Sequence, residues 1–131
     1  MFIRFHRLNN NLKLGLIVFI IYVFNRFLLK SLDLPYISYF LENHFNDFLG
    51  GILFCCYVNA LLFYNKKKLI TNFFLLFSFM LIVSIIWEGI FPLFLKYSTP
   101  DILDIIAYMC GTFLYYLLLN RYNKKLNDII V

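Results

Sequence analysis

Charged side chains are scarce in this chain of 131 residues, where Asp, Glu, Lys and Arg together make up 15% of the sequence. Soluble domains carry roughly 25%. Hydrophobic residues instead make up 63%, 17 residues are Phe and 10 are Tyr, and the mean hydropathy is +0.79. A small soluble domain keeps too much of its surface in water to hide that much apolar area. The composition therefore excludes a soluble globular protein and predicts a polytopic, all-α membrane protein with a single domain.

The motifs of familiar enzyme classes are also missing. The chain has no H-E-x-x-H, no P-loop and no Ser/His/Asp set, and its only histidines are His6 and His44. Its three cysteines, Cys55, Cys56 and Cys110, lie inside apolar runs without metal-ligand spacing, which is typical of small apolar side chains in membrane spans. The sequence thus predicts no cofactor, and it identifies neither catalytic residues nor metal ligands.

Four apolar runs remain, each close to the ~17–25 residues that a membrane helix needs. They predict spans at residues 14–29, 48–64, 69–91 and 102–119. Basic residues lie at the ends of these runs and not on a wettable face, which argues against a nucleic-acid partner. Three precede the first span, three separate the second and third, and three follow the fourth, which is nine of the 12. This excess of Lys and Arg predicts that both termini are cytoplasmic.

The acidic residues collect on the opposite side of the predicted bundle. Only Asp128 is then cytoplasmic, and the other six of the seven carboxylates are on the outer side. At 1.5 Å per residue from the basic anchors, Asp47, Glu88 and Asp104 reach similar depths, roughly 25–30 Å. The side chain of Arg26, roughly 20 Å along the first span, is long enough to extend toward the same layer. We therefore expect one basic and three acidic groups to meet near the outer boundary of the membrane.

Helical spacing adds further members to this group. One face of the fourth span carries a stripe at spacings of three, four and three residues, formed by Asp101, Asp104, Tyr108 and Gly111. The whole predicted cluster, whose role is either to bind a ligand or to hold the bundle together, comprises Arg26, Asn46, Asp47, Glu88, Asp101, Asp104 and Tyr108.

Several of these residues also have a purely structural interpretation. Asp101 suits the N-cap of the fourth span, and Asp47 suits the beginning of the second. An ion pair of Arg26 with Asp104 or Glu88 would only lock the helices, and His44 fits a loop side chain at the membrane interface. Against this, ionisable residues inside membrane spans mark functional sites by default. The residues alone leave both interpretations open.

Four stretches together resemble a known family: "NRFLLK", "YFLENHFNDFLGG", "WEGIFP" and "YSTPDILDIIAYMCG". The chain is similar to the VanZ-like family of small bacterial membrane proteins, and in particular to its short Bacteroidota-type members. The matching positions are Asn25, Arg26, Asn46, Asp47, Glu88, Pro92, Thr99, Asp101, Asp104, Tyr108 and Gly111. The resemblance implies a multi-pass protein of the bacterial cytoplasmic (inner) membrane with a recurring acidic and polar residue set. The family has no settled biochemical activity.

The leading functional hypothesis is a polar pocket on the outer-leaflet side that holds a lipid or cell-envelope ligand, in a protein surrounded by membrane lipids. One alternative is a small secondary transporter or channel, which with four helices would act as a homo-oligomer. Another is a metal-assisted lipid-phosphate enzyme, because clustered carboxylates can hold Mg²⁺ together with a phosphate. A structural role beside another membrane protein also fits the sequence.

Overall fold

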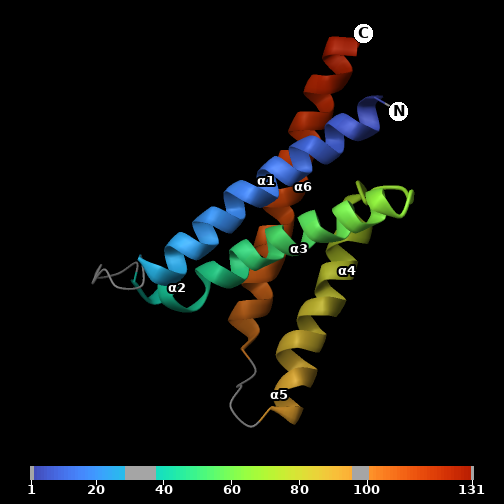
Figure 1. Ribbon diagram of the computed structural model, residues 1–131. Coiled ribbons are helices and arrows are strands. Elements are labelled where there is room, and N and C mark those ends of the chain that lie inside the picture. The colour runs from blue at the N-terminus through green and yellow to red at the C-terminus, as the bar shows by residue number, and fades with distance from the viewer. Residues whose placement is uncertain (1, 29–37, 96–100, 131) are drawn as a thin grey trace.

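The computed structural model describes residues 2–28, 38–95 and 101–130, and these residues form helices and short connections (Figure 1). No strand occurs in these three ranges. Four helical segments are long and apolar enough to cross a membrane, namely Phe5–Phe27, Phe45–Tyr64, Phe73–Phe94 and Ile102–Leu119. The prediction of an all-α protein with four membrane helices is therefore confirmed.

The helices extend beyond the predicted spans at both ends of the chain. Helix α1 covers Phe2–Phe27 and α6 covers Ile102–Ile130, because helical backbone hydrogen bonds continue where polar side chains replace apolar ones. The other long helices are α3, Phe45–Tyr64, and α4, Phe73–Ile85. The short segments are α2, Ser38–Asn43, the π-helix η2, Ile86–Ile90, and α5, Phe91–Phe94. The predicted end of the first span at Leu29 lies outside the described residues.

Helix α4 begins later than the hydrophobic run that predicted it. The side chain of Asn72 accepts a hydrogen bond from the backbone N–H of Leu75 at 3.3 Å and thereby caps the helix. Such a cap satisfies one of the backbone donors that have no partner inside the helix. The preceding residues 67–72 are not helical.

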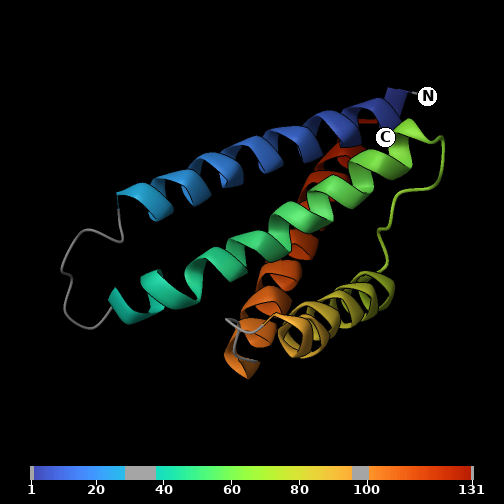
Figure 2. The ribbon, with the colours of Figure 1, turned by 60° about the horizontal axis from the view of Figure 1, so that its bottom comes forward.

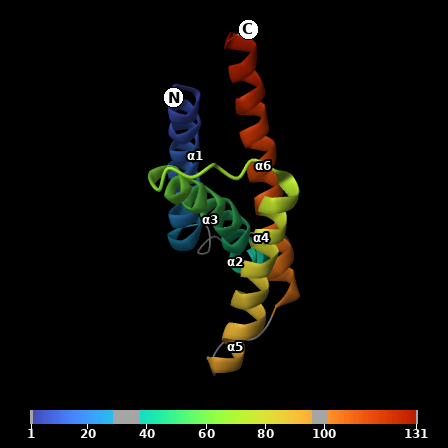
Figure 3. The same cartoon turned by 90° about the vertical axis from the view of Figure 1, so that its right-hand side faces the viewer.

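Helices α3 and α6 form the centre of the bundle. They make the most extensive contact with each other, while α1 packs mainly on α3, and α4 packs mainly on α6 (Figure 2). The beginning of α1, the turn after α3 and the end of α6 lie toward one end of the molecule, and α2 and α5 lie toward the other (Figure 3). Which end faces the cytoplasm stays a prediction.

Two glycines allow the backbones of α3 and α6 to touch. A Cβ atom at Gly51 would collide with the carbonyl oxygen of Tyr108, and one at Gly111 would collide with the carbonyl oxygen of Phe48. Small residues permit such close approaches between membrane helices, where dispersion contacts drive association. The apolar core around this crossing comprises Val18, Leu49, Ile52, Cys55, Cys56, Leu76, Tyr115 and Leu119.

A buried hydrogen-bond network joins the elements on one side of the crossing. The hydroxyl group of Tyr115 donates to Asn11 Oδ1 at 2.6 Å and accepts from Asn59 Nδ2 at 2.8 Å. Asn59 also bonds both backbone groups of Ile70, at 2.8 and 3.2 Å, and Asn11 donates to the carbonyl oxygen of Cys56 at 2.8 Å. The network therefore ties α1, α3, α6 and the residues before α4 together in an apolar setting.

The π-helix follows from a proline four residues beyond Glu88. Pro92 has no N–H to give to the carbonyl oxygen of Glu88, so the regular α-helical ladder is interrupted there. The N–H of Phe91 instead bonds the carbonyl oxygen of Ile86, five residues back. Wide turns of this kind occur often at functional sites.

Replacing Gly111 by Ala should destabilise the bundle, because the new methyl group meets backbone that cannot rotate away. We expect a loss of about 1–3 kcal/mol, seen as a lower unfolding midpoint by circular dichroism in mild detergent. Gly89→Ala is the matched control, since its Cβ would meet only Ile85 Cγ2 at 3.9 Å. Equal midpoints for the two variants would contradict the close approach.

Tyr115→Phe should also lower the unfolding midpoint. The change removes one hydroxyl group and leaves the side chains of Asn11 and Asn59 short of a buried partner, which costs about 1–3 kcal/mol for each group left unsatisfied. Tyr116→Phe on the same helix is the control, because no hydrogen bond of its hydroxyl group occurs among the described residues. A midpoint unchanged in both variants would show that the network adds no stability.

Candidate functional site

A second polar group lies on the other side of the crossing, where α3 and α6 begin. The hydroxyl group of Tyr108 donates a hydrogen bond to Asp47 Oδ1 at 3.0 Å and so joins α6 to α3. The ring of Tyr108 fits against Gly50, where a Cβ atom would lie 3.2 Å from Tyr108 Cε1. The structure thus brings together two residues of the predicted cluster that are far apart in the sequence.

His44 is the residue whose contact with Asp104 the sequence analysis did not predict. It occupies the turn between α2 and α3, is 7% exposed, and its ring meets the ring of Tyr39 edge-on with centroids 5.6 Å apart. Its Nδ1 lies 2.7 Å from Asp104 Oδ1 on α6. The expected turn position of His44 is therefore found, and the structure adds that its ring is buried against Asp104; its place at the membrane interface stays a prediction. A histidine one residue before a helix gave no periodic signal that would have aimed it at Asp104.

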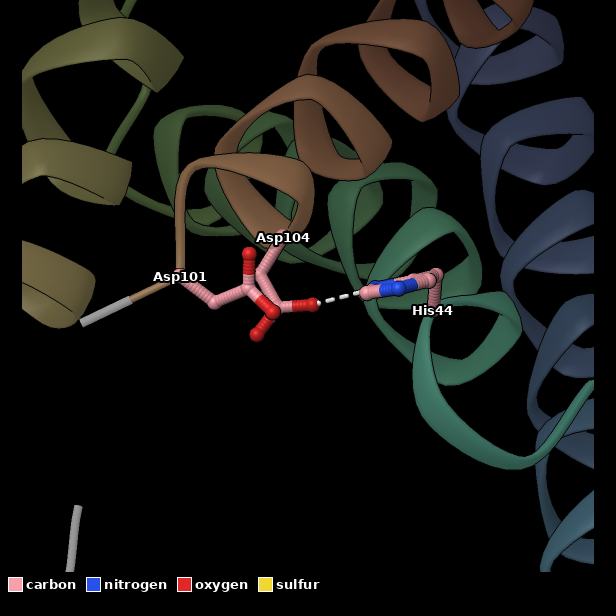
Figure 4. A group of neighbouring side chains, drawn as sticks. All are labelled: His44, Asp101 and Asp104. Carbon is pink, nitrogen blue, oxygen red and sulfur yellow. Dashed lines mark hydrogen bonds and ion pairs between the residues drawn. The ribbon is translucent and has the colours of Figure 1, made fainter. Parts of the chain in front are cut away.

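Asp101 performs the capping role proposed for it. Its Oδ1 accepts a hydrogen bond from the backbone N–H of Leu103 at 2.8 Å, at the beginning of α6. One ligand atom each of His44, Asp101 and Asp104 lie within 4.8 Å of one another. Figure 4 shows the carboxylates of Asp101, just before α6, and Asp104, in its first turn, beside the imidazole ring.

Glu88 faces this group from the π-helix. Its side chain is 9% exposed, and the negative charges of Asp47, Asp101 and Asp104 act on it. Among the described residues, Glu88 has no hydrogen-bond or ion-pair partner. A buried carboxylate beside three others experiences electrostatic repulsion that favours the arrival of a cation.

Arg26 lies apart from these carboxylates. Its side chain is exposed, and within the described part of the chain no ion pair joins it to Asp104 or Glu88. Arg26 comes from α1, which packs mainly on α3, whereas Glu88 comes from η2, which lies against α6. The neighbouring Asn25 is buried instead and donates a hydrogen bond to Asn46 Oδ1 at 2.8 Å. Asn46 therefore stabilises the packing of α1 on α3 through this hydrogen bond.

The cluster of five predicted residues and His44 is hereafter called the acidic cluster, with members His44, Asp47, Glu88, Asp101, Asp104 and Tyr108. Thr99, which belongs to the matched pattern, lies outside the described residues. A cavity of about 300 Å³ adjoins the acidic cluster between α3, α4 and α6. It is lined by Gly50, Phe54, Met80, Val83, Ser84, Trp87 and Tyr108.

Tyr108 belongs to both regions, because its ring borders the cavity while its hydroxyl group bonds Asp47. The hydroxyl group of Ser84, one turn before Glu88, donates a hydrogen bond to the carbonyl oxygen of Leu81 at 3.0 Å. Because this hydroxyl group is already paired within its own helix, the cavity wall is mostly apolar. A polar, negatively charged site thus continues into an apolar cavity.

Comparison with family models, with curated proteins and with solved structures finds no match for this chain. The resemblance to the VanZ-like family accordingly stays a prediction.

A double-mutant cycle distinguishes the two partners considered for Asp104. We expect His44→Gln and Asp104→Asn to be coupled by about 1 kcal/mol in the free energy of unfolding, because their side chains touch. Arg26→Gln and Asp104→Asn should be additive, because Arg26 is exposed. Unfolding in detergent with a chelator present measures both cycles, and coupling of Arg26 but not of His44 would overturn the assignment.

Proposed function

We propose that this protein binds a lipid or cell-envelope ligand at the acidic cluster, on the outer-leaflet side of a bacterial cytoplasmic membrane. The proposal includes the orientation with both termini in the cytoplasm and the VanZ-like character that the sequence suggests. Binding, without chemical conversion, is the simplest activity that the residues support, since no nucleophile and base pair of a known enzyme class stands out among them.

The observation that carries the proposal is the excess of carboxylates in the acidic cluster. Asp47, Glu88, Asp101 and Asp104 come from three helical segments, and His44 is the single basic side chain that contacts them among the described residues. Burying charge without a counter-charge is expensive, and a purely structural cluster would match it with Arg or Lys. A ligand that brings positive charge, in its own groups or as a bound cation, supplies the missing counter-charge.

The adjoining cavity indicates an amphiphilic ligand. Its volume of about 300 Å³ is at the lower end of ligand sites, and its wall of Phe54, Met80, Val83 and Trp87 suits a hydrocarbon segment. A head group in the acidic cluster and an apolar segment in the cavity would satisfy both regions at once. Membrane lipids and lipid-linked envelope precursors have this division between head and chain.

The test is native mass spectrometry of the protein purified in a lipid-preserving detergent. We expect the wild type to retain a specific added mass and Glu88→Gln and Asp104→Asn to lose it, because each removes a negative charge from the site. Glu42→Gln is the matched control, since Glu42 is an exposed carboxylate two residues before His44, and no hydrogen bond or ion pair joins it to the acidic cluster among the described residues.

A specific result requires that the Glu42→Gln control retains the added mass of the ligand. Retention of the same mass by both cluster variants, with normal folding by circular dichroism, would refute a ligand site at the acidic cluster. Loss of the mass in all three carboxylate variants would also count against it, because a general change in charge would then explain the effect.

A further inference from the structure

We propose that His44, Asp101 and Asp104 form a binding site for a divalent metal ion, of which Zn²⁺ and Mn²⁺ are the best candidates. This inference rests on the proposed function in one respect, because it identifies the positive charge that the acidic cluster takes up. The three residues are hereafter called the metal triad.

The geometry of the metal triad is close to that of coordinated side chains. One ligand atom from each residue lies within 4.8 Å of the other two, and Nδ1 of His44 is 2.7 Å from Oδ1 of Asp104. Zn²⁺ binds nitrogen and oxygen ligands at about 2.0–2.2 Å, so two ligands of one ion lie at most about 4.4 Å apart. Small side-chain rotations would bring all three atoms into that range.

The ligand types select the kind of metal. An imidazole beside two carboxylates suits Zn²⁺ and Mn²⁺, whereas Ca²⁺ and Mg²⁺ prefer oxygen ligands alone. Three protein ligands also leave a coordination position for water or for an oxygen atom of the bound ligand. The metal triad therefore resembles an open site more than a closed structural one.

Glu88 provides an independent indication that a cation belongs here. It comes from a different helix, is 9% exposed, and among the described residues has no partner for its charge. The charges of Glu88 and Asp47 both interact with that of Asp104 in the metal triad. A divalent ion would offset this repulsion, and metal ions are often the largest local charge in such sites.

The preference of helix N-termini for acidic residues accounts only in part for the metal triad. Acidic residues are favoured at a helix N-terminus, and Asp101 Oδ1 already caps the helix through Leu103. This does not explain His44, which comes from the turn before α3, is buried, and points its Nδ1 at Asp104. Asp101 still has its second oxygen atom for a metal.

The experiment uses the full chain in detergent, stripped with a chelator and then equilibrated with Zn²⁺, Mn²⁺, Mg²⁺ or Ca²⁺. Bound metal per chain after gel filtration and the shift of the unfolding midpoint are measured. We expect one Zn²⁺ or Mn²⁺ per chain and a raised midpoint, with no retained Mg²⁺ or Ca²⁺. His44→Gln and Asp101→Asn should lose the ion; Asn still caps a helix, so the second variant keeps its fold.

The controls are His6→Gln, the other histidine, and Cys110→Ser, the exposed cysteine, and both should retain the ion. No stoichiometric metal in the wild type, or equal binding by the folded Asp101→Asn and His44→Gln variants, would overturn the proposal. The same samples are weighed for the co-purified ligand. If no metal binds but the ligand is retained, the metal triad is refuted and the ligand site stands; if metal binds but no ligand is retained, the metal triad is supported and the ligand site is refuted.

Discussion

The contact between the backbones of α3 and α6 is the constraint on which the rest of the structure depends. Gly51 and Gly111 bring the two helices so close that a single added carbon atom on either would collide with the other helix. This approach sets the position of every side chain that projects from the pair. Toward the beginning of both helices it allows Tyr108 to reach Asp47, and toward their ends it allows Tyr115 to reach Asn59. Helices α1 and α4 then cover opposite sides of an already fixed centre.

The two polar groups on either side of this contact differ in their balance of donors and acceptors. Around Tyr115, amide and hydroxyl groups pair with one another and with backbone, so donors and acceptors match and no net charge is buried. In the acidic cluster, acceptors outnumber donors, and several of the acceptors carry charge. Matched networks specify a packing arrangement. The unmatched charges of the acidic cluster lower the stability of the isolated chain. Natural proteins usually break such local rules at functional sites.

Much of the bundle was predictable because membrane helices leave strong local signals. The apolar runs indicated the four spans. The spacing of Asp101, Asp104 and Tyr108 predicted one shared helix face, on which Asp104 meets His44 and Tyr108 meets Asp47, but it did not say which helix lies opposite. The helix cap at Asp101 was also predictable from the sequence. The position of Arg26 was not predictable, because the depth of a residue along a span does not show which neighbouring helix its side chain faces. His44 and the pairing of Asn59 with Ile70 depend on turns whose course no periodic pattern encodes.

The wide turn at Ile86–Ile90 has a consequence for the alignment of side chains along the third span. In a regular α-helix, residues four apart advance by about 40° beyond a full revolution, so a row such as Met80, Ser84 and Glu88 drifts around the cylinder. A π-turn takes more residues per revolution and rotates its side chains back. Here all three side chains stay buried. The π-turn thus offsets part of this drift, so that Glu88 stays buried in the same row as Met80 and Ser84.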